Sequence, residues 1–298
     1  MQESSLNILI IGSKGFIGSY CVEYFSKNNK VYQCDVVTDY AANNYFVVDA
    51  TNADYTEIFE SEKFDVCINC SGAASVPDSL TKPLRDFTLN VVNVYKQLDA
   101  IRRFNPDCKY INLSSAAVYG NPQYLPIDEN HPLKPISPYG FNKKNAEEVC
   151  KLYHENYNIK TCSLRIFSAY GNGLKKQLFW DLYKKSIGNH EISLFGTGKE
   201  SRDFIHVMDV VQAIECVINK ASFNGARINI ANGEELRISD VVEIFFKMSG
   251  EEVKIDFAGK ERKGDPKNWK ADISKLKSLG YSPNITITNG LKEYAKWL

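Results

Sequence analysis

Short apolar runs and amphipathic stretches alternate along the first half of the chain. Residues 6–12 (LNILIIG) are a continuous apolar run that ends in glycine, a pattern typical of a parallel strand buried on both faces. Comparable runs occupy residues 31–37, 46–50, 64–70, 109–115 and 161–171. Helical apolar spacing occupies residues 19–28, 55–61, 83–104 and 138–157. This alternation of strand and helix predicts an open α/β sheet.

Shorter elements follow Gly171. The pattern predicts helices over 177–188, from about 207 to 219, over 238–250 with Ser239 as a candidate cap, and over 288–298. It predicts strands over 191–196, 227–233 and 252–259. The predicted fold is α/β, with a doubly wound parallel sheet in residues 1–170, to which 203–230 return, and a smaller α/β domain in 171–298. Because no linker separates the two parts, we expect a ligand to bind between them.

A glycine-rich turn connects the first predicted strand to the first predicted helix. It reads GSKGFIG and contains Gly12, Gly15 and Gly18, with Phe16 and Ile17 between the last two. Small residues let the backbone approach a pyrophosphate, whose charge then lies at the helix amino terminus. Between a strand and a helix, this spacing predicts a Rossmann-type dinucleotide site formed by these five residues.

Asp35 ends the second predicted strand, 17 residues after Gly18. A carboxylate at this position accepts hydrogen bonds from the adenosine ribose hydroxyls and repels a 2′-phosphate, which favours NAD over NADP. The alternative is an ordinary turn aspartate. Because the glycine turn precedes it, we predict that Asp35 contacts the cofactor.

Two further loops follow predicted strands, at the edge where ligands bind in such sheets. One contains the exit of strand 46–50, and the other is the small-residue segment 70–79 (CSGAASVPDS). Asn90 lies amid apolar positions of helix 83–104, where a buried hydrogen-bonding residue is commoner than a catalytic one. We predict cofactor contacts by Asp49, Ala50, Cys70, Gly72, Ala73 and Asn90, and a substrate contact by Ser75.

The segment from 114 to 143 contains the candidate chemistry. Tyr139 precedes Lys143 by four residues, a spacing that places both side chains on one face of a helix. A phenol titrates near ~10 and is a poor base at neutral pH unless a cation such as Lys143 stabilises its phenolate. Ser115, at the end of a predicted strand, is the candidate hydroxyl for bonding both the phenol and a substrate alcohol. The alternative interpretation of Tyr139 and Lys143 is an amphipathic helical pair without chemistry.

Composition excludes several classes of partner. The chain has 298 residues, is 44% hydrophobic, and carries 36 basic and 36 acidic residues. It can therefore bury a sizeable core, and it lacks the net field that attracts nucleic acid or an anionic membrane. The apolar run at the amino terminus is too short for a signal peptide core or a membrane span, so we expect a cytoplasmic protein.

The cysteines do not indicate a metal or redox site. They are scattered through apolar segments, at positions 21, 34, 67, 70, 108, 150, 162 and 216. Cys67 and Cys70 form a CxxC within a predicted strand, where residues three apart point to opposite faces. We therefore predict structural, reduced cysteines and no bound metal.

Five separate motifs together resemble the extended short-chain dehydrogenase/reductase family, in particular its NAD-dependent nucleotide-sugar epimerases and dehydratases. They occur in the family's order and cover nearly the whole chain. The motifs are GSKGFIG at 12–18, SSAAVYG at 114–120, YGFNK at 139–143, RDFIHVMDV at 202–210 and RKGDPKNWKADISK at 262–275. The resemblance implies a role in nucleotide-sugar metabolism, as in polysaccharide biosynthesis, and a homodimer paired through helices 83–104 and 138–156.

The resemblance also implies roles for individual residues. Tyr139 would be the catalytic base and acid, Lys143 would lower its pKa and hold the nicotinamide ribose, and Ser115 would orient the sugar hydroxyl. The remaining implied contacts, all to a UDP- or dTDP-sugar, are Arg202 and Arg262 on the diphosphate, Asp265 on the nucleoside ribose, and Ala116 and Ser168 near the sugar. An arginine fork matches phosphate oxygens bidentately, which agrees with this assignment.

Departures from the family pattern narrow the reaction. Dehydratases of the family have an Asp-Glu pair where this chain has Ala116 and Ala117, and alanines supply neither acid nor base for eliminating water. The main hypothesis is an NAD-dependent 4-epimerase that transiently oxidises the sugar's 4-hydroxyl. The alternative is an NAD(P)H-dependent reductase of a 4-keto-6-deoxy nucleotide sugar, and a non-catalytic dinucleotide sensor is the third. Lys14, Asn142 and Ser168 also depart from the usual residues, which leaves the sugar open.

Overall fold

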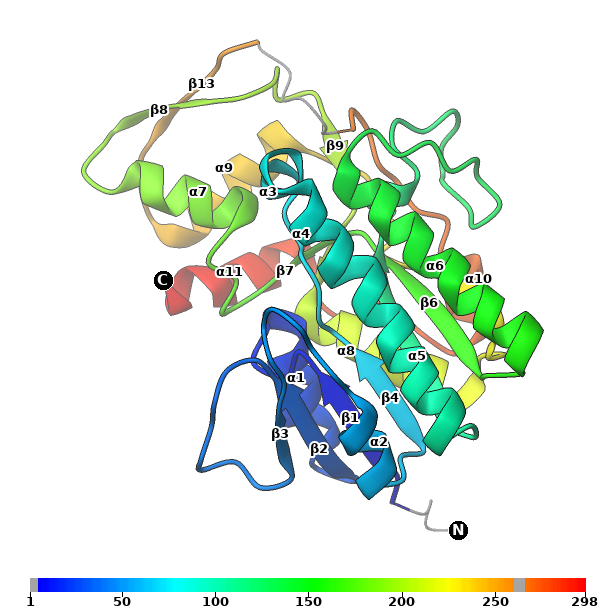
Figure 1. The fold of residues 1–298 in the computed structure, drawn as a ribbon. Helices are drawn as coiled ribbons and strands as arrows, with labels where there is room; N and C mark the ends of the chain where they lie inside the picture. Colours follow the sequence, from blue (N-terminus) through cyan, green and yellow to red (C-terminus); the bar gives the residue numbers. More distant parts are fainter. Residues whose placement is uncertain (1–4, 260–265) are drawn as a thin grey trace.

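The computed structural model describes residues 5–259 and 266–298. At its centre lies a seven-stranded parallel sheet with the strand order β11-β6-β5-β4-β1-β2-β3 (Figure 1). The strands are β1 (Asn7–Ile11), β2 (Lys30–Asp35), β3 (Tyr45–Val47), β4 (Val66–Asn69), β5 (Lys109–Ser115), β6 (Thr161–Ile166) and β11 (Asn224–Ile230). Each apolar run predicted in the first half supplies a strand of this sheet, which confirms the α/β class.

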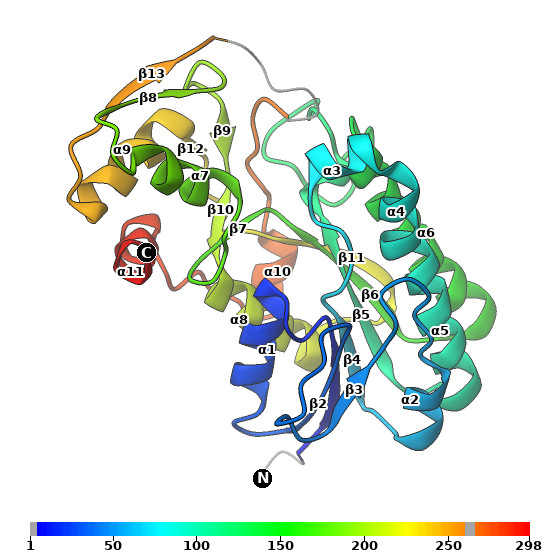
Figure 2. The same ribbon diagram turned by 60° about the vertical axis from the view of Figure 1, so that its left-hand side comes forward.

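Helices cover both faces of the sheet (Figure 2). The helices on one face are α1 (Phe16–Phe25) and α8 (Val207–Lys220), and those on the other are α2 (Thr56–Ser61), α5 (Asn93–Phe104) and α6 (Pro138–Tyr157). Strand β1 shows why its run is continuously apolar: Ile8 and Ile10 pack in the core under α8, whereas Leu9 and Ile11 pack under α5 and α6.

A smaller lobe lies beyond the carboxyl ends of the strands (Figures 1 and 2). Its elements are α7 (Gln177–Ser186), β8 (Glu191–Leu194), β9 (Ser201–Arg202), β12 (Leu236–Arg237), α9 (Ile238–Ser249), β13 (Lys254–Phe257) and α11 (Ile287–Trp297). They enclose a separate apolar cluster that includes Phe179, Phe245 and Tyr294. Between β9 and β12 the chain returns to the large sheet through α8 and β11, and α10 (Ser274–Ser278) packs beside them.

Three details differ from the sequence prediction. The predicted strand 161–171 breaks at Phe167, whose N–H donates to Ile230, and continues as β7 (Ser168–Tyr170), which pairs with β10 (Phe204–His206) instead of the large sheet. The predicted helix 83–104 is α4 (Pro83–Phe87), a π-helical turn (Thr88–Val92) and α5. Ser239 is not a cap, because α9 begins after Arg237 and the Ser239 hydroxyl donates to Asp240.

Candidate active site

The glycine turn is compressed between β1, β2 and the loop after β4. Gly12 has φ +79°, and a Cβ there would lie 2.7 Å from the Ser71 nitrogen. A Cβ on Gly18 would lie 2.0 Å from the Gly12 oxygen, so neither position admits a side chain. Helix α1 begins at Phe16, after Gly15, and no side chain caps it. Its first N–H groups are thus left for a ligand, and this geometry fits a dinucleotide pyrophosphate.

Asp35 is held rigidly at the end of β2. Its carboxylate accepts the Lys14 N–H at 2.9 Å and the Val36 N–H at 2.7 Å. The Lys14 ammonium pairs with Asp39 and lies 5.1 Å from the Tyr45 ring centre. The carboxylate of Asp35 therefore stands directly beside the glycine turn, in the position that the sequence argument requires for a ribose contact.

The other two cofactor loops are arranged differently. Asp49 and Ala50 are exposed beyond β3, and the Asp49 carboxylate closes a local turn by accepting the Thr51 and Asn52 N–H groups at 2.6 and 2.9 Å. In the loop after β4, Ser75 caps α3 (Val76–Thr81) through its Oγ, which accepts the Asp78 N–H at 3.2 Å. Cys70 and Ala73 are half-buried in this loop.

Gly72 brings together residues from three segments. A Cβ on Gly72 would lie 2.5 Å from Asn90 Oδ1 and 3.6 Å from Lys143 Nζ. Asn90 is buried in the π-helical turn, and its Oδ1 accepts no hydrogen bond within the described chain. A buried acceptor without a partner, beside a position that only glycine can occupy, is the kind of site at which a cofactor supplies the missing donor.

The predicted catalytic residues meet where α6 begins. Ser137 caps this helix by accepting the Gly140 N–H at 3.1 Å, and Pro138 occupies the first turn. A Cβ on Gly140 would lie 2.4 Å from the Ala117 oxygen, so the helix packs directly against the turn that follows Ser115.

Lys143 reaches back to β5. Its Nζ donates to the Leu113 oxygen at 2.8 Å and lies 5.9 Å from the Tyr139 ring centre. Strand β5 therefore both ends in Ser115 and anchors the ammonium.

Burial dominates the protonation of this pair. Burial raises the pKa of Tyr139 to about 12, a hydrogen bond with Ser115 lowers it, and the charge of Asp86 raises it. Burial also lowers the pKa of Lys143 to about 8, against the raising effect of Asp86. In the protein alone, the group that favours the phenolate is Ser115, because the Lys143 ammonium points to a carbonyl of β5. The phenol thus carries its proton at neutral pH until further positive charge arrives.

The predicted substrate contacts come from several segments of the chain. Arg202, on β9, donates to the Ser201 and Lys267 oxygens at 2.8 and 3.1 Å and lies 5.5 Å from the Trp269 ring centre. Ser168 begins β7 and is half-buried, whereas Ala116 is fully buried in the core. Arg262 and Asp265 lie outside the described residues.

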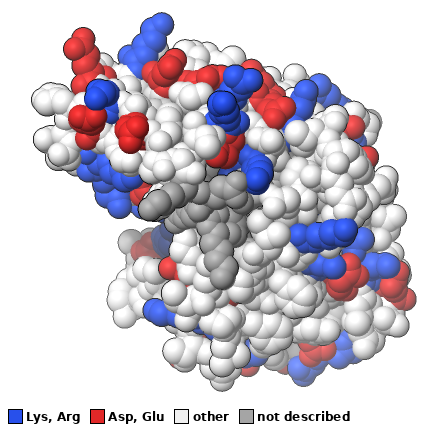
Figure 3. Space-filling view, turned by 90° about the horizontal axis from the view of Figure 1, so that it is seen from above, with Lys and Arg blue, Asp and Glu red and all other residues white. Residues whose placement is uncertain are grey.

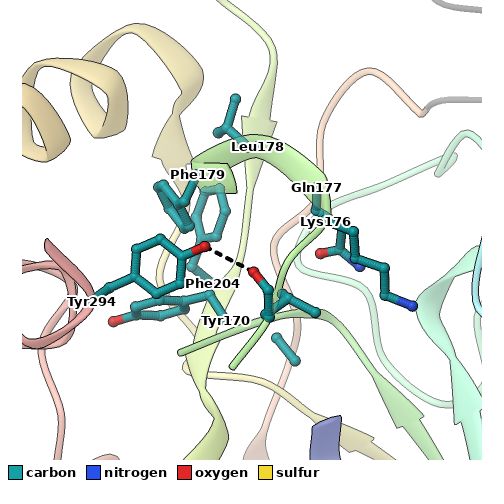
Figure 4. A pocket seen from close by; sticks show the side chains of 9 residues that line it. Tyr170, Lys176, Gln177, Leu178, Phe179, Phe204 and Tyr294 are labelled. Atoms are coloured by element: carbon teal, nitrogen blue, oxygen red, sulfur yellow. Dashed lines mark hydrogen bonds between the residues drawn. The ribbon is translucent and has the colours of Figure 1, made fainter. Parts of the chain in front are cut away.

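A small cavity lies in the smaller lobe (Figure 4). It measures about 20 Å³, and its wall includes Tyr170, Phe179, Phe204 and Tyr294. The Tyr294 hydroxyl donates to the Leu174 oxygen at 2.8 Å, while Lys176 points away from the rings. A space of this size holds about one water molecule, so it is a packing gap and not a sugar site.

Other kinds of site find no support in the described residues. No group of three or more metal-ligating side chains occurs there, and none of the helices described combines the length and apolarity needed to cross a membrane. The eight cysteines are free thiols. Basic and acidic side chains are interspersed over the face shown in Figure 3.

Two contributors to the site were missed by the sequence argument. One is the Leu113 carbonyl, and the other is Asp86, which is only 2% exposed and accepts a hydrogen bond from Asn142 Nδ2 at 2.8 Å. A backbone oxygen carries no sequence signal. Asp86 carries none either, because charged residues also occupy the exposed side of the same helical segment, and its partner Asn142 lies 56 positions away.

Comparisons with known proteins identify the family. The sequence profile of the NAD dependent epimerase/dehydratase family matches residues 8–231. A putative UDP-glucose 4-epimerase of Methanocaldococcus jannaschii is 32% identical, with 98% of each chain covered. The UDP-N-acetylglucosamine 4-epimerase of Methanobrevibacter ruminantium M1, solved with UDP-N-acetylmuramic acid, superposes with a TM-score of 0.89 at 27% identity, covering 99% of this chain and 98% of that one. The UDP-glucuronic acid 4-epimerase of Bacillus cereus, solved with UDP-glucuronic acid and NAD, gives 0.88 at 26% identity and 98% coverage of both chains. The chain therefore belongs to the NAD-dependent epimerase/dehydratase family.

Proposed function

We propose that this protein is an NAD-dependent UDP-sugar 4-epimerase. The similar proteins named above carry that activity in their names, and they span the full length of the chain. The observation that carries the proposal is the meeting of Ser115, Tyr139 and Lys143 beside Gly72 and Asn90. A fold alone would not indicate a reaction, whereas a hydroxyl, a phenol and an ammonium beside a dinucleotide site indicate the oxidation of an alcohol or the reduction of a ketone.

The proposed chemistry is a reversible oxidation of the sugar at carbon four. With oxidised NAD bound, Tyr139 would start as the phenolate, its own proton having passed to solvent. The phenolate takes the proton of the 4-hydroxyl and later returns it to the same oxygen, while Ser115 holds that oxygen by a hydrogen bond. Lys143, anchored on Leu113, keeps a positive charge 5.9 Å from the Tyr139 ring centre, which favours the phenolate before and after this proton transfer. When bound, NAD brings a positively charged ring that accepts a hydride and gives it back to the other face of the keto-sugar.

We assign the two parts of the chain to the two ligands. Residues 1–170 with 203–230 hold NAD, and the lobe of residues 171–298 holds the nucleotide sugar. Around the NAD cleft, the glycine turn, Asp35 and Asn90 have geometry that supports their assignment. On the substrate side, Arg202 stands at the mouth of the smaller lobe as the proposed diphosphate ligand, with Ser75 and Ser168 nearer the sugar.

We also propose a homodimer paired through α4, α5 and α6. Large apolar side chains are exposed on these helices, among them Leu84 at 75%, Phe141 at 55%, Tyr95 at 41% and Leu152 at 38%. Such a surface on neighbouring helices favours a partner of the same kind. Sedimentation tests this directly: Leu152→Glu should yield a monomer, while Tyr40→Glu, at a fully exposed loop position, should remain a dimer.

The experiment that tests the function omits added cofactor. Purified protein is incubated with UDP-glucose, UDP-N-acetylglucosamine or UDP-glucuronic acid, and the 4-epimers are measured by NMR. We expect an epimer from at least one of them, and a dinucleotide of the mass of NAD released on denaturation. The Tyr139→Phe variant should bind the same sugar and turn over on the order of 10²- to 10⁴-fold more slowly. Strict dependence on added NAD(P)H would overturn the epimerase and favour the 4-keto-sugar reductase.

A further inference from the structure

A buried carboxylate from α4 reaches the helix that carries the catalytic pair. Asp86 is 2% exposed, and its Oδ1 accepts hydrogen bonds from Asn142 at 2.8 Å and from Asn90 at 3.1 Å. These contacts tie α4, the π-helical turn and α6 together. The second oxygen, Oδ2, has no hydrogen-bond partner among the residues that the structure describes. A buried carboxylate with one oxygen unpaired lowers the stability of the fold, so stability does not explain its presence here.

The charge of Asp86 acts on the two residues assigned to the chemistry. It raises the pKa of Lys143 and that of Tyr139. The hydrogen bond to Asn142, the residue before Lys143, ties the Asp86 carboxylate to the first turns of α6, the part of the helix that carries the catalytic pair. Asn90, the other donor, lies against Gly72, where a Cβ would approach both Asn90 and Lys143.

Four other titratable groups lie near Lys143, and the two that follow it on α6 cannot replace Asp86 as an unbalanced negative charge. They are Cys70 after β4, Glu147 and Cys150 on α6, and Tyr139 itself. Glu147 accepts hydrogen bonds from Arg165 at 2.7 Å and Ser114 at 2.6 Å, so its charge is balanced elsewhere. Burial raises the pKa of Cys150 to about 12, which keeps that thiol neutral. Among the described residues, Glu147 forms ion pairs with two arginines, whereas Asp86 forms none. The charge of Asp86 is therefore the one that is not balanced by a neighbouring cation.

We propose that Asp86 is a positioning residue of the active site: its buried negative charge favours the ammonium form of Lys143, and its hydrogen bonds to Asn142 and Asn90 fix α6 against the Gly72 loop. This inference rests on the proposed function for its catalytic consequence, but the charge relation itself is a property of the protein alone. It assigns a role to a buried group that the mechanism above does not use.

Two substitutions separate the charge from the hydrogen bonds. Asp86→Asn removes the charge and keeps an oxygen that can accept from Asn142 and Asn90. Asn142→Ala removes one hydrogen bond and keeps the charge. Asp99→Asn, on the exposed surface of α5, is the control for removing a remote negative charge. The ionisation of Lys143 is followed by NMR in protein carrying [6-13C]lysine, with the Lys143 signal identified from Lys143→Arg.

We expect the titration midpoint of Lys143 to fall by about one pH unit or more in Asp86→Asn. Asp86→Ser, which also lacks the charge, should give a fall of the same sign and thus separates the effect from any local rearrangement. Asp99→Asn should leave the midpoint unchanged, and Asn142→Ala, which keeps the charge, should lower it by much less than Asp86→Asn does. In the active enzyme, the alkaline limb of kcat/KM should move down by the same interval in Asp86→Asn, because the catalytic lysine loses its proton earlier.

The outcome that overturns the proposal is an unchanged Lys143 midpoint in Asp86→Asn, or an equal fall in Asn142→Ala, which would make the role of Asp86 purely structural. If the wild-type protein epimerises no UDP-sugar, the proposed function fails, whereas the NMR titration still decides the relation between Asp86 and Lys143.

Discussion

Two buried carboxylates contribute to the environment of α6, Glu147 from the helix itself and Asp86 from α4, and they are paired very differently. Glu147, on α6 itself, accepts hydrogen bonds from Arg165 Nη2 at 2.7 Å and Ser114 Oγ at 2.6 Å, and lies 3.3 Å from Arg227 Nε. Asp86 reaches the helix from α4, accepts only amide hydrogen bonds, and leaves Oδ2 without a hydrogen-bond partner among the described residues. Both pay for burying a charge. Glu147, which is fully paired, holds α6 against the central sheet. Asp86, which is half-paired, contacts the part of α6 that carries Tyr139 and Lys143.

The same substitution applied to both carboxylates tests this contrast, and the larger effect is expected at Glu147. Glu147→Gln leaves the Arg165 guanidinium, 1% exposed at its side chain, without its counter-ion. Removing one partner of a buried ion pair costs about 3–5 kcal/mol of unfolding free energy. Urea unfolding at pH 7 measures it. Glu148→Gln, one residue away on the exposed side and paired with Arg227, is the control and should cost no more than about 1 kcal/mol.

His206 extends the comparison to a buried group without a strong ion partner. Its Nδ1 accepts the Met208 N–H at 3.3 Å, and its Nε2 lies 4.0 Å from the Glu293 carboxylate. Burial lowers the pKa of His206 to about 4, below the ~6.5 of an unfolded chain. The unfolded state therefore takes up a proton first, and stability is lost as the pH falls from about 6.5 towards 4, by about 3 kcal/mol at most.

The matched variant for this prediction is His206→Asn, which retains an acceptor for the helix cap and does not titrate. Unfolding measured between pH 4 and 7 should be flatter for this variant than for the wild type. Parallel pH dependences in the two proteins would assign the acid loss to other groups.

Gly72 tests the surroundings of Asp86, because Asn90 contacts both residues. Gly72→Ala places a Cβ 2.5 Å from Asn90 Oδ1, at a φ of +120°. We expect NAD binding, measured by calorimetry on stripped protein, to weaken at least about tenfold, which corresponds to about 1.4 kcal/mol. Gly188→Ala has a φ of +71° and open space around its Cβ, so it carries backbone strain without the clash. Its affinity for NAD should be that of the wild type.

The sequence predicts features that depend on residues close together in the chain, and it does not predict contacts between distant segments. The glycine turn, and Tyr139 with Lys143, are set by spacings of a few residues, so their elements were predicted with small errors at the ends. The break of strand 161–171 at Phe167 depends on the backbone oxygens of Ile230 and Asp203, which accept the N–H groups of Phe167 and Ser168. Both acceptors lie far away in the sequence, so the pattern around Phe167 does not reveal the break. Likewise, Lys143 points to Leu113 because of how α6 packs on β5, which helical spacing cannot reveal. Contacts between distant segments were the part that only the fold supplies.

The smallest expected effect completes the test of the two carboxylates. Asp86→Asn should change the free energy of unfolding by less than about 1 kcal/mol, because an amide oxygen still accepts from Asn90 and Asn142 and a buried charge is removed together with its desolvation cost. The measurement is the urea unfolding used for Glu147→Gln, on the same day and at the same pH. Equal losses in both variants would mean that Asp86 is held as firmly as Glu147 and that its pairing is complete. A small loss at Asp86 together with a lowered Lys143 midpoint would separate the two carboxylates by role: one fastens the helix to the sheet, and the other sets the charge of its catalytic end.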